Sequence, residues 1–283
     1  MMTKKEKILI VGLGLIGGSY AEGLTDAGFE VGAIDTRGDA IRYAYDKGII
    51  SSGDTVVRKP YIEQFDIIIF ALYPKLTIEW LEKYQMYIKP GTLITDVSGI
   101  KTWLIDKIEP LLRSDLEFVG AHPMAGREVY GVENSDKNIF LNANYIIVPS
   151  KSSTIRGMNI VKEIGEILGF KNIVTLSKEE HDEMIGFLSQ LTHCIAVSLM
   201  TTKDSQNLVE YTGDSFRDLT RIAKINENMW SELFLLNKEE LVSQISLFEE
   251  QLGKLKKTIE NDEVDKMKEI MRLSTLNRSY FDK

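Results

Sequence analysis

The sequence of 283 residues contains one cysteine, three histidines and six prolines, and these scarcities exclude several kinds of protein. The single cysteine, Cys194, cannot form an internal disulfide, which favours a reducing compartment, and we expect a cytoplasmic protein. Three scattered histidines and one cysteine provide no zinc-ligand spacing, so we expect no metal site. Without an uninterrupted run of about 18 apolar residues, the sequence also predicts no membrane span.

Positive charge is also in short supply, because 34 Lys and Arg residues face 42 Asp and Glu residues and leave a net charge of −8. An acidic balance argues against a role at nucleic acid or at a membrane surface, where a basic patch is usual. It leaves room for an anionic small molecule bound at a local basic site. The hydrophobic content of 43% and the charged content of 27% are those of a globular protein, and the chain is long enough for two domains.

Apolar runs and helix-length segments alternate through the first part of the chain. Most of these runs are apolar throughout, which is typical of strands covered on both faces in a parallel sheet. Gly28 and Gly169 follow two of the helix-length segments, at positions where C′ glycines end helices. The pattern predicts a doubly wound α/β domain of the Rossmann type. We expect its strands in KILIVG, FEVGAID, FDIIIFAL, GTLITDV, LEFVGA, NYIIVPS and KNIVTLS.

The alternation ends near Ser177, where the segment SKEE is typical of a capping box with Ser177 as N-cap and Glu180 as its partner. The residues beyond it show helical spacing only, so we expect an all-helical second domain. We place the boundary between a domain of residues 1–177 and a domain of residues 178–283. A stripe from Leu241 to Ile259 has coiled-coil-like spacing. It is explained either by packing within its own domain or by an interface between two subunits.

The segment VGLGLIGG follows the first expected strand and precedes a helix-length segment. Its glycines fit the dinucleotide-binding pattern: Gly12 permits a tight turn, Gly14 allows a pyrophosphate to approach the backbone, and Gly17 allows the helix to pack on the strand. Asp35 ends the next strand and suits the ribose of NAD, whereas Arg37 could pair with the extra phosphate of NADP. A turn that binds no cofactor is the alternative. The expected NAD-binding residues are Gly12, Gly14, Leu15, Ile16, Gly17 and Asp35.

His122 occupies the position where an apolar run, FVGA, gives way to Pro123. We expect the strand to end there, because proline cannot donate a hydrogen bond to a sheet. Ligands of an open α/β sheet gather beyond the carboxyl ends of its strands, so we expect His122 beside a bound nicotinamide ring. An imidazole at that point suits proton transfer during oxidation of an alcohol. The alternative is a histidine that only stabilises the turn.

The helical part of the chain holds two more histidines and a cluster of basic residues. His193 falls opposite the apolar stripe of its helix, where it either lines a cleft or makes a buried helix contact. His181 lies among carboxylates in a first helical turn and suggests a structural hydrogen-bond anchor. Arg217, Arg221 and Lys224 share helical spacing and suit a grip on a carboxylate, with a solvated helix face as the alternative.

Four segments of the sequence, VGLGLIGGS, AHPMAGRE, LTHCIAVSL and SFRDLTRIAKINENMW, resemble those of the prephenate/arogenate dehydrogenase family of tyrosine biosynthesis. The resemblance covers nearly the whole chain. It implies an NAD-dependent enzyme that converts prephenate to 4-hydroxyphenylpyruvate by oxidative decarboxylation. It also implies a homodimer formed through the helical domain.

The same resemblance assigns roles to particular residues. His122 matches the catalytic histidine that hydrogen-bonds the ring 4-hydroxyl, and His193 matches a second active-site histidine that helps to hold the substrate. Arg221 matches the arginine that binds the dianionic substrate. Trp230 and Glu128 match further positions of the active site.

The loop after the fourth expected strand departs from the family pattern. Many members have DVGS in this loop, with a serine that contacts the substrate hydroxyl, whereas this sequence has DVSG. Gly99 occupies the position of that serine. Either Ser98 therefore takes the role from a shifted loop, or a water molecule does.

Three other functions remain open at the level of sequence. An arogenate dehydrogenase acts on a substrate with an amine in place of the side-chain keto group, and the sequence does not distinguish the two. A β-hydroxyacid dehydrogenase or an imine reductase shares the glycine loop and a helical domain, but the segment AHPMAGRE and His193 argue against both. A non-catalytic NAD-binding sensor would bind the cofactor without turnover.

Overall fold

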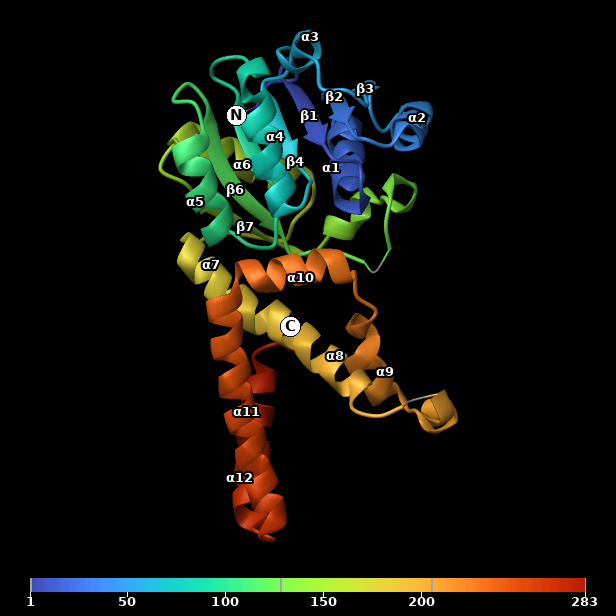
Figure 1. Ribbon diagram of the computed structural model, residues 1–283, viewed down its shortest axis with the longest axis vertical. Coiled ribbons are helices and arrows are strands. Elements are labelled where there is room, and N and C mark those ends of the chain that lie inside the picture. Colours follow the sequence, from blue (N-terminus) through green and yellow to red (C-terminus); the bar gives the residue numbers. More distant parts are fainter. Residues whose placement is uncertain (1, 128, 205, 283) are drawn as a thin grey trace.

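The computed structural model describes residues 2–127, 129–204 and 206–282 (Figure 1). Within these residues, an eight-stranded sheet forms the centre of the amino-terminal region, with strand order β3-β2-β1-β4-β5-β6-β7-β8. The change of direction in this order, between β1 and β4, is that of a doubly wound sheet. The strands are β1 (Lys7–Val11), β2 (Glu30–Ile34), β3 (Ser52–Asp54), β4 (Ile67–Phe70), β5 (Leu93–Asp96), β6 (Glu117–Pro123), β7 (Asn144–Pro149) and β8 (Asn172–Thr175).

Helices cover both faces of the sheet and enclose two apolar cores (Figure 1). Along β4, Ile67 and Ile69 point into one core, while Ile68 and Phe70 point into the other, as expected for a strand buried on both faces. The predicted α/β fold class is confirmed. The first core is covered by α1 (Leu15–Asp26), α2 (Gly38–Asp46) and α6 (Ile155–Ile167), and the second by α3 (Lys59–Ile62), α4 (Pro74–Tyr84) and α5 (Thr102–Leu111).

The sheet departs from the expected arrangement in two strands. β7 runs antiparallel to β6, with Ala121 opposite Ile147. In the described residues between β6 and β7, the chain forms loops and the short 3₁₀ turns Val132–Asn134 and Lys137–Phe140. Without a crossover helix in these residues, β7 pairs antiparallel with β6. β3 is an additional edge strand, and its residues, SGD, give no apolar signal in the sequence.

β6 continues through His122 to Pro123, so the expectation that the strand ends before these residues is wrong. Pro123 pairs with Tyr145 of β7. On the side away from β7, β6 pairs with β5 only as far as Val119. Pro123 lies beyond this pairing, so its missing N–H group removes no hydrogen bond between β5 and β6. His122 therefore lies in a regular strand that is paired with β7 but, at this position, no longer with β5.

The helical region begins with a continuous run of α7 (Lys178–Ile185), a π-helical segment (Gly186–Leu191) and α8 (Thr192–Thr201). The predicted capping box is confirmed, because Ser177 accepts a hydrogen bond from the Glu180 backbone and Glu180 accepts one from the Ser177 backbone. Two further helices follow, α9 (Asp214–Thr220) and α10 (Glu227–Leu236), and α10 lies across the carboxyl edge of the sheet (Figure 1). The last two, α11 (Lys238–Glu260) and α12 (Val264–Ser279), form a hairpin that extends away from the sheet.

The run Lys178–Thr201 has the length and the apolar composition of a membrane-spanning helix, which the sequence analysis does not anticipate. Its first half, however, buries three polar side chains inside the protein: His181, Asp182 and Gln190. The Asn237 side chain donates hydrogen bonds to the Asp182 carbonyl oxygen and to the Gln190 side chain. These internal hydrogen bonds identify the first half of the run as a core helix.

Candidate active site

The glycine loop between β1 and α1 has the shape that its sequence predicts. Gly12 has a φ of +100°, and a Cβ atom at Gly17 would lie 2.0 Å from the Gly12 carbonyl oxygen, so neither position accepts a side chain. At Gly14, by contrast, a Cβ atom would meet nothing within 4 Å. Leu15 and Ile16 follow in the first turn of α1, where backbone N–H groups and the helix dipole favour a phosphate. The loop therefore fits the pyrophosphate of a dinucleotide.

Asp35 directly follows β2 and faces the same loop. Its carboxylate accepts hydrogen bonds from the backbone N–H groups of Leu13, at 2.7 Å, and Arg37, at 2.8 Å. These bonds hold the carboxylate where it can accept further hydrogen bonds from ribose hydroxyls. The Arg37 guanidinium lies 3.5 Å from the Glu133 carboxylate, which competes with a 2′-phosphate for the same cation. The arrangement therefore fits NAD better than NADP.

His122 is partly exposed on β6 and is linked by hydrogen bonds to a buried carboxylate. Its Nδ1 atom lies 2.9 Å from Nε2 of His181, and Nδ1 of His181 lies 2.7 Å from the Asp182 carboxylate. Desolvation by the surrounding protein lowers the pKa of His122 well below its ordinary value, and the neighbouring His181 and Lys101 lower it further. A neutral His122 is therefore available as a proton acceptor at neutral pH.

The Asp182 carboxylate is fixed by the start of α5. It accepts hydrogen bonds from the backbone N–H groups of Lys101, at 2.8 Å, and Thr102, at 2.7 Å. Burial alone would raise the pKa of Asp182, but the hydrogen bonds from His181 and from these two N–H groups lower it overall. An ionised carboxylate therefore stands behind the two imidazole rings.

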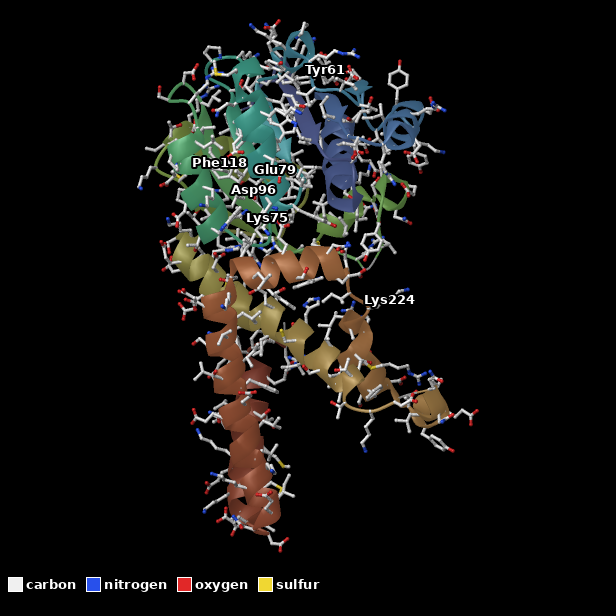
Figure 2. The ribbon with its side chains drawn as sticks, in the orientation of Figure 1. Tyr61, Lys75, Glu79, Asp96, Phe118 and Lys224 are labelled. Atoms are coloured by element: carbon white, nitrogen blue, oxygen red, sulfur yellow. The ribbon has the colours of Figure 1, made fainter. Side chains whose placement is uncertain are left out.

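A second ion pair is fully buried near His122. Nζ of Lys101 donates a hydrogen bond of 2.6 Å to the Asp96 carboxylate, and neither side chain is exposed to solvent. Asp96 lies at the end of β5 (Figure 2) and also accepts hydrogen bonds from the backbone N–H groups of Ser98 and Ala121. Loss of either partner of the ion pair would leave an unpaired buried charge. The hydrogen bond from Ala121 joins the Asp96 carboxylate of β5 to β6.

The loop after β5 approaches the free side of His122. A Cβ atom at Gly99 would lie 3.7 Å from Nε2 of His122, so this ring nitrogen faces Gly99 while Nδ1 faces His181. Gly99 therefore leaves space at the position where the family pattern has a serine. The neighbouring Ser98 hydroxyl is buried and, among the described residues, has no hydrogen-bond partner. A polar group of this kind can bind a ligand that enters the site.

Helix α10 covers this loop from the helical region. Glu232 of α10 accepts a hydrogen bond of 3.0 Å from the backbone N–H of Lys75, which lies beside α10 (Figure 2). Leu233 of α10 lies 3.8 Å from the Cβ position at Gly99. The carboxyl edge of the sheet and α10 therefore form the two walls of the site.

His193 of α8 and Trp230 of α10 are in contact. Their rings are stacked, with centroids 3.7 Å apart and planes inclined by 29°. Nδ1 of His193 lies 2.8 Å from the Ser189 carbonyl oxygen, which belongs to the π-helical segment. A backbone N–H at the start of α8 and the Thr192 hydroxyl, at 2.6 Å, also donate to this carbonyl oxygen. Trp230 precedes Leu233 by one turn of α10, so this helix connects His193 with the surroundings of His122.

The remaining predicted residues lie beyond α8. The helix predicted through Arg217 and Arg221 ends at Thr220, and Arg221 is exposed in the 3₁₀ turn Arg221–Ala223, which packs against α8. Arg217 instead pairs with Asp214 at 3.4 Å, as expected for a solvated helix face. Glu128 lies outside the described residues.

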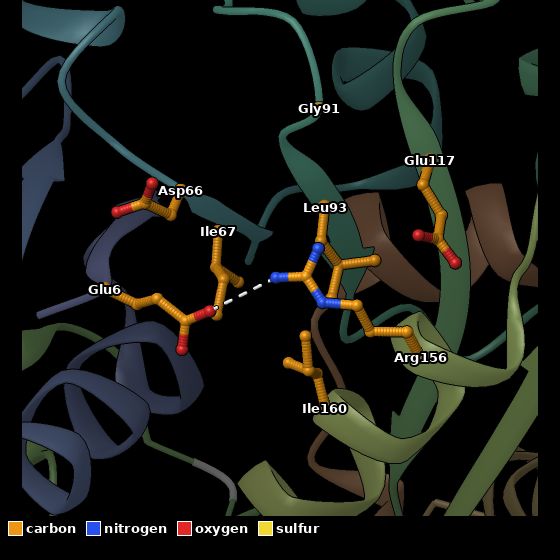
Figure 3. Close-up of a pocket in the computed structure, with 8 residues that line it drawn as sticks. All are labelled: Glu6, Asp66, Ile67, Gly91, Leu93, Glu117, Arg156 and Ile160. Carbon is orange, nitrogen blue, oxygen red and sulfur yellow. Dashed lines mark hydrogen bonds and ion pairs between the residues drawn. The ribbon is translucent and has the colours of Figure 1, made fainter. Parts of the chain in front are cut away.

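A cavity at the opposite edge of the sheet is separate from this site (Figure 3). Glu6, Asp66, Gly91, Glu117 and Arg156 are among the residues that line it, and Arg156 pairs with Glu6 at 3.5 Å. Its volume is about 70 Å³. Pockets for small ligands usually measure roughly 300–1,000 Å³, so this cavity is too small for a ring-containing substrate.

The sequence analysis missed His181, Asp182 and Lys101 as parts of the site. His181 is 59 residues from His122 along the chain, so no local spacing connects them. The local signal was a His–Asp pair directly after a capping box, which suggested a structural anchor. His181 is indeed an anchor, but the group that it holds is the candidate catalytic imidazole.

Comparison with known proteins identifies relatives of both regions. Residues 20–174 match the family model described as prephenate dehydrogenase, nucleotide-binding domain, and residues 177–273 match that described as prephenate dehydrogenase, dimerization domain. The prephenate dehydrogenase of Lactococcus lactis is 34% identical over 259 residues, which cover 88% of this chain and 70% of that protein. The prephenate dehydrogenase of Bacillus subtilis is 30% identical over 278 residues, which cover 94% of this chain and 74% of that protein.

Solved structures agree with these matches. The crystal structure of prephenate dehydrogenase from Aquifex aeolicus in complex with hydroxyphenyl propionate and NAD⁺ has a TM-score of 0.88 and 30% identity, and the match covers 99% of each chain. The Synechocystis arogenate dehydrogenase has a TM-score of 0.82 at 22% identity, covering 97% of this chain and 99% of that one. The second likeness concerns the fold alone.

Proposed function

Because the chain belongs to the prephenate dehydrogenase family and is an NAD-dependent oxidoreductase, we propose that it converts prephenate to 4-hydroxyphenylpyruvate in tyrosine biosynthesis. The reaction oxidises the ring 4-hydroxyl and releases carbon dioxide, and the ring becomes aromatic. The observation that carries the proposal is the direction of Nε2 of His122, which faces the space beside Gly99 at the carboxyl edge of the sheet. That edge is where a dinucleotide on the glycine loop presents its nicotinamide.

His122 acts as the general base in this proposal. Its neutral ring takes the proton of the 4-hydroxyl on Nε2, and bound NAD accepts the hydride from C4 of the ring. The nascent ketone is vinylogous to the ring carboxylate, so its oxygen receives the electron pair that carbon dioxide leaves behind. The phenolate formed in this way takes the proton back from Nε2 of His122. Base catalysis of this kind typically contributes about 10²–10⁴ in rate.

We assign the binding of the substrate to residues on both walls of the site. Arg221 suits a bidentate grip on a carboxylate, and the stacked His193 and Trp230 suit contact with the ring-borne side chain. The Ser98 hydroxyl, buried and without a partner among the described residues, suits a hydrogen bond to the reacting oxygen. Glu128 is assigned a further binding role on the family resemblance.

We also propose that two copies of the chain form a homodimer through the helical region. The family model that matches this region is described as a dimerization domain. Apolar side chains are exposed along α11 and α12, among them Leu252, Ile259, Leu273 and Leu276. Contiguous exposed apolar faces often mark sites of protein association. Sedimentation equilibrium should give twice the chain mass of 32.1 kDa.

We place the enzyme in the cytoplasm, with a small-molecule substrate and without a nucleic-acid or membrane partner. Cys194 is a free cysteine, which suits a reducing compartment. The net charge of −8 disfavours binding to polyanionic surfaces.

The test is steady-state formation of the reduced cofactor with prephenate and with arogenate, each with NAD and with NADP. We expect the highest kcat/KM for prephenate with NAD. A higher kcat/KM for arogenate would make the chain an arogenate dehydrogenase. Tight binding of NAD with no turnover of either substrate would contradict the proposed activity and favour a non-catalytic NAD-binding sensor. Membership of the family removes the β-hydroxyacid dehydrogenase alternative.

A further inference from the structure

We propose that His181 is a positioning residue that fixes the tautomer of His122 and so directs a lone pair toward the substrate. The inference deepens the proposed function, because it explains how His122 is prepared as the base. It rests on the hydrogen-bond chain from Asp182 through His181 to His122. In each hydrogen bond of this chain, donor and acceptor can be assigned by starting from the Asp182 carboxylate, which can only accept.

Asp182 sets the direction of the chain. An ionised carboxylate has lone pairs and no hydrogen to donate. Its oxygens already accept hydrogen bonds from the backbone N–H groups of Lys101 and Thr102, which can only donate. The 2.7 Å contact with Nδ1 of His181 therefore requires that this nitrogen carries a hydrogen.

The tautomer of His181 then determines which ring nitrogen of His122 carries the hydrogen. A neutral imidazole with its hydrogen on Nδ1 has a lone pair on Nε2. Nε2 of His181 lies 2.9 Å from Nδ1 of His122, so Nδ1 of His122 is the donor of that bond. The hydrogen of the His122 ring is then on Nδ1, and its lone pair is on Nε2, the nitrogen that faces Gly99.

A protonated His181 would reverse this result, because it would donate to His122 and force the hydrogen of His122 onto Nε2. His181 is fully buried, and Lys101 nearby is paired with Asp96 rather than with the rings. Burial lowers the pKa of His181, and the opposing attraction of Asp182 does not restore it. Neutral His181 is therefore the form that the surroundings stabilise.

The tautomer decides whether His122 can act as a base. With the hydrogen on Nδ1, Nε2 can take the proton of the substrate hydroxyl while the hydride leaves for the cofactor. The imidazolium that forms keeps its Nδ1–H bond to His181, and the Asp182 carboxylate behind His181 stabilises its charge. In serine proteases, which hold a catalytic histidine in the same way through one aspartate, loss of that orientation lowers kcat by about 10⁴.

The first test uses the tautomers themselves and needs no turnover. The chain has only three histidines, so the full-length enzyme with NAD and ¹⁵N-labelled histidine rings gives a spectrum of three rings. His193 also donates from Nδ1, because its partner is the Ser189 carbonyl oxygen. At mildly alkaline pH we expect the His122 and His181 rings to be neutral, and all three rings to carry a hydrogen on Nδ1. A His122 ring protonated on Nε2, or a cationic His181, would overturn the proposal.

The second test uses two substitutions of His181. His181→Leu removes the acceptor, and we expect kcat for prephenate to fall about 10²–10³-fold, while the Kd of NAD and the KM of prephenate change less than about twofold. His181→Gln can present a carbonyl oxygen to Nδ1–H of His122, and we expect it to recover most of the rate and the wild-type tautomer of His122. Equal losses in both variants, or an unchanged kcat in His181→Leu, would contradict a positioning role.

These tests separate this inference from the proposed function. If the wild-type enzyme failed to turn over prephenate or arogenate, the proposed function would fail whatever the tautomers. If turnover were normal but His122 carried its hydrogen on Nε2, only the role of His181 would fail. The spectrum of the wild-type enzyme also remains informative if His181→Leu does not fold.

Discussion

The two regions of the molecule bury their apolar side chains to very different extents. In the α/β region, whole strands such as Ile67–Phe70 have exposures of 0–1%, and two continuous cores flank the sheet. In the described part of the helical region, α9, α10 and α12 contain no buried residue, and α11 buries only Leu241 and Thr258. The buried residues of both cores all belong to the α/β region, and these four helices add few buried residues of their own.

The difference in burial suggests that the helical region forms an interface. α11 has 23 residues and α12 has 16, yet Leu252 is 55% exposed and Leu273 is 59% exposed. Helices in water are stabilised chiefly by packing of an apolar face, so these two require a covering surface. A second copy of the chain supplies it in the proposed homodimer. In the proposed function, the α/β region carries the cofactor and the base, and the helical region covers the substrate.

The largest expected effect is on the base in the α/β region. His122→Asn retains a side chain that can donate to His181 but has no proton acceptor of suitable pKa. We expect kcat for prephenate to fall by about 10²–10⁴. The Kd of NAD, measured by fluorescence titration, should stay within about twofold, because the glycine loop is untouched. A variant with wild-type turnover would remove His122 as the base.

The contrast in burial is tested by a pair of core and surface substitutions. Ile69→Ala removes a side chain that is 0% exposed, and we expect it to lower the free energy of unfolding by about 2–5 kcal/mol at every protein concentration. Leu252→Ala should instead lower the thermal midpoint more strongly as the protein is diluted, because it weakens the dimer. A concentration-independent effect of Leu252→Ala would show that this face is not an interface.

The helical region is expected to contribute binding rather than chemistry. Arg221→Ala removes a charge-assisted hydrogen bond worth about 1.5–3 kcal/mol, so we expect the KM of prephenate to rise roughly 10–150-fold with little change in the KM of NAD. Arg217→Ala is the matched control, because Arg217 pairs with Asp214 in solvent, and it should leave both constants unchanged. Similar effects of the two variants would argue against a carboxylate site at Arg221.

The smallest expected effect is on the pH dependence of kcat. Desolvation holds the pKa of His122 well below the ordinary value of 6.5, so the ring stays neutral and able to accept a proton as the pH falls to 6.5. We expect kcat to be constant from about pH 8 to pH 6.5 and to decline only below that range. A base with an ordinary pKa would already have lost about half of its active form at pH 6.5. A half-maximal kcat there would contradict a desolvated His122.

Much of the fold could be predicted because its signals are local. The apolar runs, the glycine loop and the capping box at Ser177 each lie within a few residues, and each formed as expected. β3 was missed because SGD has no apolar residue. The antiparallel direction of β7 was missed because the described residues after β6 form no crossover helix, and strand composition does not reveal this.

The site was predictable only in part, because its geometry depends on contacts between distant segments. The position of His122 followed from its place at the end of an apolar run. Its connection to His181 and Asp182 did not, because α7 reaches β6 only through the fold. The stacking of Trp230 on His193 likewise depends on how α10 crosses α8. The roles given to the site residues all remain predictions: His122, His193, Ser98, Arg221, Trp230 and Glu128.

A crystal structure of the enzyme with NAD⁺ and 4-hydroxyphenylpyruvate would test the central claim most directly. The account predicts that the phenolic oxygen lies about 2.6–3.2 Å from Nε2 of His122, with the nicotinamide ring against the opposite side of the bound carbocycle. A phenolic oxygen held by other groups, with Nε2 of His122 turned into the protein interior, would contradict it.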